Sequence, residues 1–233
     1  MGKSNKYEDI VKELVADAKI NVISEDIELE ENDVTRLSQG ASAVMNMFMK
    51  VFATDKGIDV RTALLYSAGL AGYAAHKAVK ETDEALFTVV ETANGCKYYF
   101  GQEVNKYIFD SKYSFRSCCE GMFMKEAPGA VIPDVEAVAK KVVETIGNPD
   151  YLIDKMYKPQ EIYTEVQKCW NSIYQGMIAL FCKKPSEWPV MFSIVASNMM
   201  KRAMNVAPKE DVYLFATEVA CHVSKMDDDS IAE

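Results

Sequence analysis

Apolar residues recur at helical spacing along most of this chain. Between residues 34 and 51 they are separated by steps of three and four, which aligns them on one face of a helix. The residues of this face are Val34, Leu37, Ala41, Val44, Phe48 and Val51. Similar spacing predicts helices over residues 5–19, 60–80, 102–110, 114–126 and 134–146, followed by three longer helices from Pro159 onward. The pattern therefore predicts a mainly α protein, a multi-helix bundle of about eight or nine helices.

The helix expected over residues 60–80 is rich in small side chains. Asp59 precedes it as a cap, and Ser67, Ala71 and Ala75 are spaced by four. Its two internal glycines each cost about 1 kcal/mol relative to alanine, so we expect close packing to compensate. An almost uniformly apolar helix of this kind is typical of the centre of a bundle.

One segment near residues 86–100 has β character. Two runs rich in β-branched and aromatic residues flank Asn94-Gly95, a sequence typical of a two-residue hairpin turn. That turn predicts a β-hairpin inserted among the helices, with Glu91 opposite Tyr98. Its more apolar face then consists of Phe87, Val89, Glu91, Cys96, Tyr98 and Phe100. A register shifted by one residue would instead turn Glu91 to solvent.

The chain shows no internal repeat and no low-complexity segment, and we expect a single helical domain over residues 1–233. The only candidate for a domain boundary is the short segment 147–158, which contains the turn Asn148-Pro149. Residues 1–4 and the acidic end at residues 227–233 are expected to be frayed.

Charge and cysteine content narrow the choice of partners. The 26 basic and 35 acidic residues give a net charge of −9, which opposes binding to nucleic acid. No apolar run is long enough to span a bilayer, so we expect no membrane partner. The six cysteines form no CxxC pair and no secretory signal precedes them, which favours free thiols and a cytoplasmic location.

No established catalytic motif is present, so candidate chemistry depends on isolated residues. Glu91 is the first candidate, because burial of a carboxylate on the inward face of the hairpin would prepare it for acid–base catalysis. We expect His76 or Tyr98 to assist it, and the competing interpretation of His76 is a core histidine with one hydrogen bond. Binding residues are expected after the hairpin and on the following helix: Gln102, Glu103, Asn105 and Arg116.

Two kinds of function are compatible with these patterns, and a third, a helical DNA-binding regulator, is opposed by the acidic balance of charge. The favoured one is a non-enzymatic binding or interaction protein that self-associates through apolar helix faces as a homo-oligomer, with a protein partner as a further expectation. The alternative is an enzyme of undefined class that acts on a small polar molecule, with Glu91 as the acid or base. With only two histidines and no ligand motif, the sequence indicates no metal and no cofactor.

Overall fold

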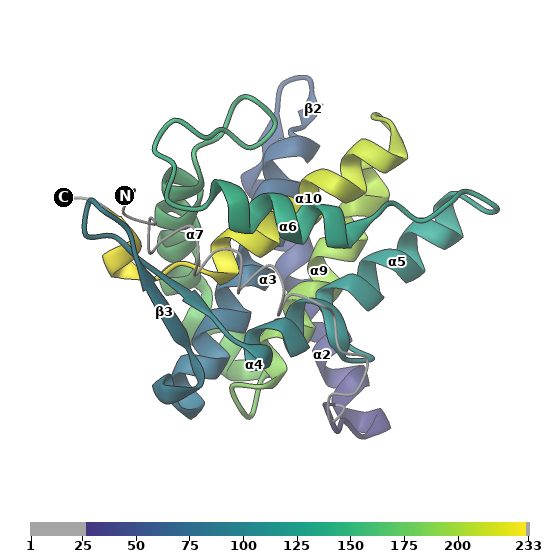
Figure 1. Ribbon diagram of the computed structural model, residues 1–233. Coiled ribbons are helices and arrows are strands. Elements are labelled where there is room, and N and C mark those ends of the chain that lie inside the picture. Colours follow the sequence, from purple (N-terminus) through teal and green to yellow (C-terminus); the bar gives the residue numbers. More distant parts are fainter. Residues whose placement is uncertain (1–26, 232–233) are drawn as a thin grey trace, which may run out of the picture.

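The computed structural model describes residues 27–231, which form mainly α-helices (Figure 1). Within these residues seven α-helices have eleven or more residues, which confirms the mainly α class but is slightly fewer than the eight or nine expected. They are α2 (Glu31–Val51), α3 (Val60–Thr82), α5 (Phe115–Glu126), α6 (Val135–Thr145), α7 (Pro159–Ile173), α9 (Glu187–Ala203) and α10 (Lys209–Ser224). None of the helices in this part of the chain is long and apolar enough to cross a membrane. The helix expected over residues 5–19 and the frayed end expected at residues 1–4 lie outside the described residues.

Shorter elements connect these helices. α4 (Gln102–Asn105) continues into a π-helical turn over residues 106–110, and the two replace the regular helix expected there. A second π-helical turn over residues 174–178 and the short α8 (Ala179–Phe181) follow α7. The strands of the described part form two antiparallel pairs, β1 (Ala53–Thr54) with β2 (Gly57–Ile58) and β3 (Thr88–Glu91) with β4 (Lys97–Phe100).

Helix α3 lies at the centre of the fold, as its small side chains predicted (Figure 1). Every residue from Ser67 to His76 is buried, and the helix packs against α7, α9 and α10. Its first turn is capped as expected, because the Asp59 carboxylate accepts a hydrogen bond from the Thr62 backbone N–H at 3.0 Å. The cap fixes where α3 begins, and the small side chains determine what it can pack against.

Two glycines of α3 allow neighbouring helices to approach closely. A Cβ atom at Gly69 would lie 2.5 Å from a methyl group of Val166 on α7. A Cβ atom at Gly72 would overlap the carbonyl oxygen of Ala220 on α10. At Gly72 the helix-propensity cost is therefore offset by a backbone contact that alanine would prevent, whereas at Gly69 the contact is with a side-chain methyl group that can move.

The β-hairpin forms where it was expected, but its register is shifted by one residue. Glu91 pairs with Lys97 rather than with Tyr98, because residues 93–95 form a three-residue loop instead of a two-residue turn. Gly95 completes this loop with a φ of +83°, a left-handed conformation typical of such hairpins. The shift buries Val90 and leaves Glu91 exposed, so the predicted inward face was wrong for the first strand.

Residues 227–231 are packed, whereas we expected the acidic end of the chain to be frayed. Asp227 and Ser230 are buried and cap one another: the Asp227 N–H donates to the Ser230 hydroxyl at 2.9 Å, and the Ser230 N–H donates to the Asp227 carbonyl at 2.9 Å. The backbone N–H of Tyr99 on β4 donates to the Lys225 carbonyl at 2.9 Å. The expectation was wrong for these residues because their polar groups find partners on the hairpin and on α3.

The segment 147–158 is anchored to the helices around it. Ile153 is fully buried and forms an isolated β-bridge with Tyr157. The Asp154 carboxylate forms an ion pair with Arg61 of α3. Asp154 and Lys155 both have positive φ angles, of 50° and 59°, which is uncommon outside glycine.

Candidate functional site

A cavity of about 510 Å³ lies between the base of the hairpin, α4, α6 and the end of α10. Its outer part is lined by the exposed Thr88 and Gln102, and its inner part by the buried Cys221 and Lys225. Apolar side chains form much of its wall: Leu86, Phe100, Phe109, Ala139, Val142 and Val143. We call it the Lys225 cavity. Its volume and its mixture of apolar walls with a few polar groups are typical of sites for small molecules.

Lys225 directly follows α10, and its side chain is buried. The ammonium group donates a hydrogen bond to the Asn105 side-chain oxygen at 2.9 Å and lies 5.7 Å from the centre of the Phe100 ring. Asn105 is its one hydrogen-bond acceptor among residues 27–231, and no carboxylate of these residues forms an ion pair with it. Lys225 is therefore a buried cation whose immediate partner is a neutral amide.

The surroundings of Lys225 lower the pKa of its amine toward neutral pH. Burial lowers the pKa of Lys225 from 10.5 to about 8, and the charge of Asp110 opposes this effect only in part. Burial also raises the pKa of the Cys221 thiol to about 12, so this group stays protonated near neutral pH. The cavity thus contains an amine that is partly uncharged under physiological conditions and a thiol that is not a nucleophile.

Asp110 is a second perturbed group beside the cavity. It ends the π-helical turn after α4 and follows Phe109, which lines the cavity. Burial raises the pKa of Asp110 to about 6, although the charges of Arg116 and Lys225 lower it. The Oδ1 atom of Asp110 is buried and has no hydrogen-bond partner among the described residues. An amine and a carboxyl group with pKa values drawn toward one another are typical of functional sites.

Three of the four binding residues expected from the sequence come together here. Gln102, Glu103 and Asn105 line the Lys225 cavity, and Asn105 binds the lysine directly. Arg116 does not line it; it lies on α5 and pairs with Glu120 at 2.6 Å. Its contribution to the site is electrostatic, through its effect on Asp110.

The three residues expected to be catalytic are not brought together. Glu91 is exposed on the outer side of the hairpin. His76 is buried on α3, with its ring stacked on Phe87 at 4.7 Å, and Tyr98 is buried on β4. None of these candidates is among the residues that line the Lys225 cavity. The arrangement around Glu91 that motivated the acid–base hypothesis depended on the two-residue turn, which does not form.

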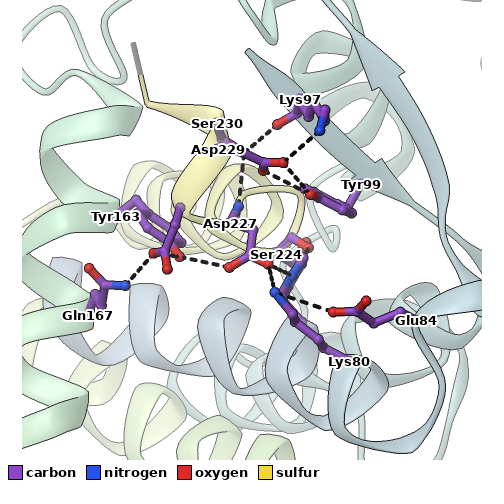
Figure 2. A network of polar contacts seen from close by, with 12 residues as sticks. Lys80, Glu84, Lys97, Tyr99, Tyr163, Gln167, Ser224, Asp227, Asp229 and Ser230 are labelled. Atoms are coloured by element: carbon purple, nitrogen blue, oxygen red, sulfur yellow. Dashed lines mark hydrogen bonds and ion pairs between the residues drawn. The ribbon is translucent and has the colours of Figure 1, made fainter. Parts of the chain in front are cut away.

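His76 instead belongs to a polar network around the buried Asp227. Figure 2 shows Asp227 with its partners Lys80 and Tyr163. Its Nε2 atom lies 3.4 Å from Asp227 Oδ2, and its Nδ1 atom lies 3.3 Å from the Ser224 carbonyl oxygen. Lys80 forms an ion pair with the same carboxylate, and the Tyr163 hydroxyl donates to its other oxygen at 3.3 Å. The network joins α3 and α7 to the residues that follow α10, and so positions the backbone that carries Lys225.

Replacing Asp227 with asparagine is expected to lower the free energy of unfolding by about 2 kcal/mol near neutral pH. Burial alone would raise the pKa of Asp227, but hydrogen bonds and charges from His76 and Lys80 outweigh it and hold the pKa below its ordinary value of 3.8. The contribution of Asp227 is therefore complete above about pH 4 and is lost as the pH falls further, because the unfolded chain binds the proton first. Urea unfolding at about pH 7 and about pH 3 should show a smaller difference between the two proteins at the lower pH.

Asp229→Asn is the matched control for this prediction. The Asp229 side chain is 40% exposed, lies 3.4 Å from Lys97 Nζ and accepts a hydrogen bond from the Tyr99 hydroxyl. We expect a change of less than about 0.5 kcal/mol, because exposed pairs contribute little. Equal losses in both variants would show that the buried Asp227 pair has no special part in holding this segment.

Lys225, Asp110 and Cys221 are not among the site residues predicted from sequence patterns. A basic residue at the end of a helix is ordinarily an exposed group that interacts favourably with the helix dipole, so Lys225 carried no signal of its own. Asp110 lay at the end of an expected helix, and Cys221 lay in an apolar run that suggested only core packing. The signal that could have found them is spatial: α4 and the end of α10 meet in the fold.

A scan against protein-family models and searches of the curated proteins and of the solved structures found no match to this chain. The protein is therefore described by its fold and its site alone: it is mainly α, and a buried amine lies at the inner end of a cavity. Within residues 27–231, no group of three or more His, Cys, Asp or Glu side chains is placed to hold a metal ion.

Proposed function

We propose that the protein binds a small organic acid in the Lys225 cavity, with the carboxylate of the ligand paired to the Lys225 side chain. The observation that carries this proposal is a buried lysine at the inner end of a cavity, with a neutral amide as its hydrogen-bond acceptor. A buried charge without an opposite partner destabilises a folded protein by several kcal/mol. An anionic ligand would supply that partner and remove the cost.

The cavity walls indicate the rest of the ligand. Phe100, Phe109 and Val142 offer an apolar surface for an aromatic or branched body. Glu103 lines the same cavity and disfavours a second carboxylate there. These features favour a monocarboxylic acid whose acidic group points inward and whose apolar body lies along α6 and the hairpin.

This proposal combines the two hypotheses from the sequence: the function is binding, and the ligand is a small polar molecule like the substrate of the alternative enzyme hypothesis. It gives no role to Glu91, because Glu91 is exposed and outside the cavity. Self-association through apolar helix faces, a protein partner and the cytoplasmic location stay predictions. Native mass spectrometry of the purified protein would check the first two and would also detect a retained small molecule.

Phenyllactate is a suitable probe, because it combines one carboxylate with an aromatic body. Titration calorimetry should show saturable binding, and the melting temperature should rise with probe concentration. Lys225→Met should weaken binding at least about tenfold, because it removes the charge-assisted contact to the carboxylate. The amide of phenyllactate should bind the wild-type protein more weakly for the same reason.

Lys201→Met is the matched control for the loss of a lysine. Lys201 lies on α9, its side chain is 46% exposed, and it is not among the residues that line the cavity. Its replacement should leave phenyllactate binding unchanged. Equal binding of the acid and its amide, or equal binding by wild type and Lys225→Met, would contradict the proposal.

A further inference from the structure

The Lys225 amine is poorly satisfied as a cation. An ammonium group has three N–H donors, and one of them has an acceptor among the described residues, the Asn105 side-chain oxygen. Its other surroundings are the face of the Phe100 ring, the uncharged Cys221 thiol and the space of the cavity. The neutral amine has no charge that needs a partner, keeps the bond to Asn105 and has a lone pair available for reaction.

Asp110 supplies the complementary group. Its Oδ1 atom is buried without a hydrogen-bond partner among the described residues, and its charge interacts with that of Lys225. A carboxyl group in such a place is stable when protonated and can donate its proton to a reacting atom. Asp110 is therefore an acid close enough to Lys225 for the charges of the two groups to interact.

We propose that Lys225 forms an imine with a 2-oxo acid of apolar side chain held in this cavity. The inference rests on the proposed function, since the same carboxylate and apolar body must first bind there. It adds the reactive group of the ligand, a ketone next to the carboxylate, and a covalent step at a named atom. The carboxylate stays beside the nitrogen throughout, so the charge pairing of the bound acid is preserved in the product.

The step balances without an oxidant or reductant. The Nζ lone pair attacks the carbonyl carbon, the C=O π electrons move to oxygen, and a proton passes from nitrogen to oxygen to give a carbinolamine. Asp110 then protonates the hydroxyl group, which leaves as water while the nitrogen lone pair forms the C=N bond. One amine, one ketone and one proton thus give one protonated imine and one water, and the Asp110 carboxylate remains beside the new cation.

Reductive trapping tests this inference directly. The full-length protein is incubated with phenylpyruvate and sodium cyanoborohydride, and the products are analysed by intact mass and by peptide mapping. We expect one adduct per chain, located at Lys225 and formed at least about tenfold faster than adducts at the exposed Lys201 or Lys209. Phenyllactate, which has the same carboxylate and body but no ketone, should give no adduct.

Two variants separate covalent chemistry from charge pairing. Lys225→Arg keeps a cation but has no nucleophilic amine, so trapping should be lost while some phenyllactate binding remains. Asp110→Asn should lower the rate of trapping per bound phenylpyruvate by about tenfold or more, because it removes the proton donor. Circular dichroism of each variant checks that the fold is retained.

Each outcome decides between the two proposals. If phenyllactate binds at Lys225 but phenylpyruvate is not trapped, the imine is overturned and acid binding stands. If neither compound binds and no adduct forms, both proposals are overturned. Adducts that form on surface lysines as fast as on Lys225 would overturn the assignment of the imine to Lys225. A trapping rate in Asp110→Asn equal to that of the wild type would overturn the role of Asp110 as the proton donor.

Discussion

Replacing Gly72 with alanine is expected to lower the free energy of unfolding by about 2–3 kcal/mol. The added methyl group would overlap the carbonyl oxygen of Ala220 and approach the Ser224 backbone nitrogen to 3.0 Å. Both atoms belong to the backbone of α10, which cannot rotate away as a side chain can. The better helix propensity of alanine offsets only about 1 kcal/mol. Thermal unfolding followed by circular dichroism should show a melting temperature lowered by about 5–10 °C.

Gly69→Ala is the matched control on the same helix. Its methyl group would meet one side-chain methyl of Val166, which can move. The gain in helix propensity then compensates for much of the strain, and we expect a change within about 1 kcal/mol. If Gly72→Ala were as stable as the wild type, or less damaging than Gly69→Ala, the close approach of α3 to α10 would not limit this position.

Local sequence patterns were sufficient to predict most helices and their starts. Asp59 and Asp134 cap α3 and α6 as expected, because a cap depends only on residues within the first turn. Pro159 begins α7 for a similar reason, since its fixed φ suits the first turn of a helix. The small residues of α3 predicted a central helix correctly, because they permit close packing whatever the partner is.

The register of the hairpin could not be predicted in the same way. Val89 and Val90 are equally apolar, so the sequence alone offers two similar inward faces that differ by one residue. Contacts with distant segments stabilise the observed one, such as the hydrogen bond from Tyr99 to the Lys225 carbonyl. The register determines whether Glu91 is buried, and the catalytic hypothesis for Glu91 depended on its burial.

Only part of the candidate site could be predicted, because the rest depends on contacts between distant segments of the chain. Gln102, Glu103 and Asn105 are a short polar run next to the hairpin, and this local signal led to three of the residues that line the Lys225 cavity. Lys225 reaches Asn105 across 120 positions of sequence, a separation that no periodicity or motif covers. Its burial is a property of the packed fold, and only the structure distinguishes it from an exposed lysine at a helix end.

Replacing Lys225 with methionine is expected to raise the free energy of unfolding by about 2 kcal/mol while ligand binding is lost. Burial lowers the pKa of Lys225 from 10.5 to about 8, and a shift of this size corresponds to a cost of about 3 kcal/mol for keeping the charge inside the protein. Loss of the hydrogen bond to Asn105 offsets about 1 kcal/mol of the gain. Urea unfolding at neutral pH without ligand measures the difference.

The pH dependence distinguishes this cause from better packing of methionine. Below about pH 8 both folded and unfolded chains carry the proton on Lys225, so the wild type bears the full cost of the buried charge. Between pH 8 and 10.5 the folded protein loses the proton first, and the stability of the wild type should rise toward that of Lys225→Met. Lys201→Met, at an exposed position, should show neither the gain nor the pH dependence. A Lys225→Met protein less stable than the wild type at neutral pH would mean that the lysine serves the fold. A Lys225→Met protein more stable than the wild type would mean that the buried amine destabilises the fold. Its presence is then better explained by a function, such as the binding of an acid.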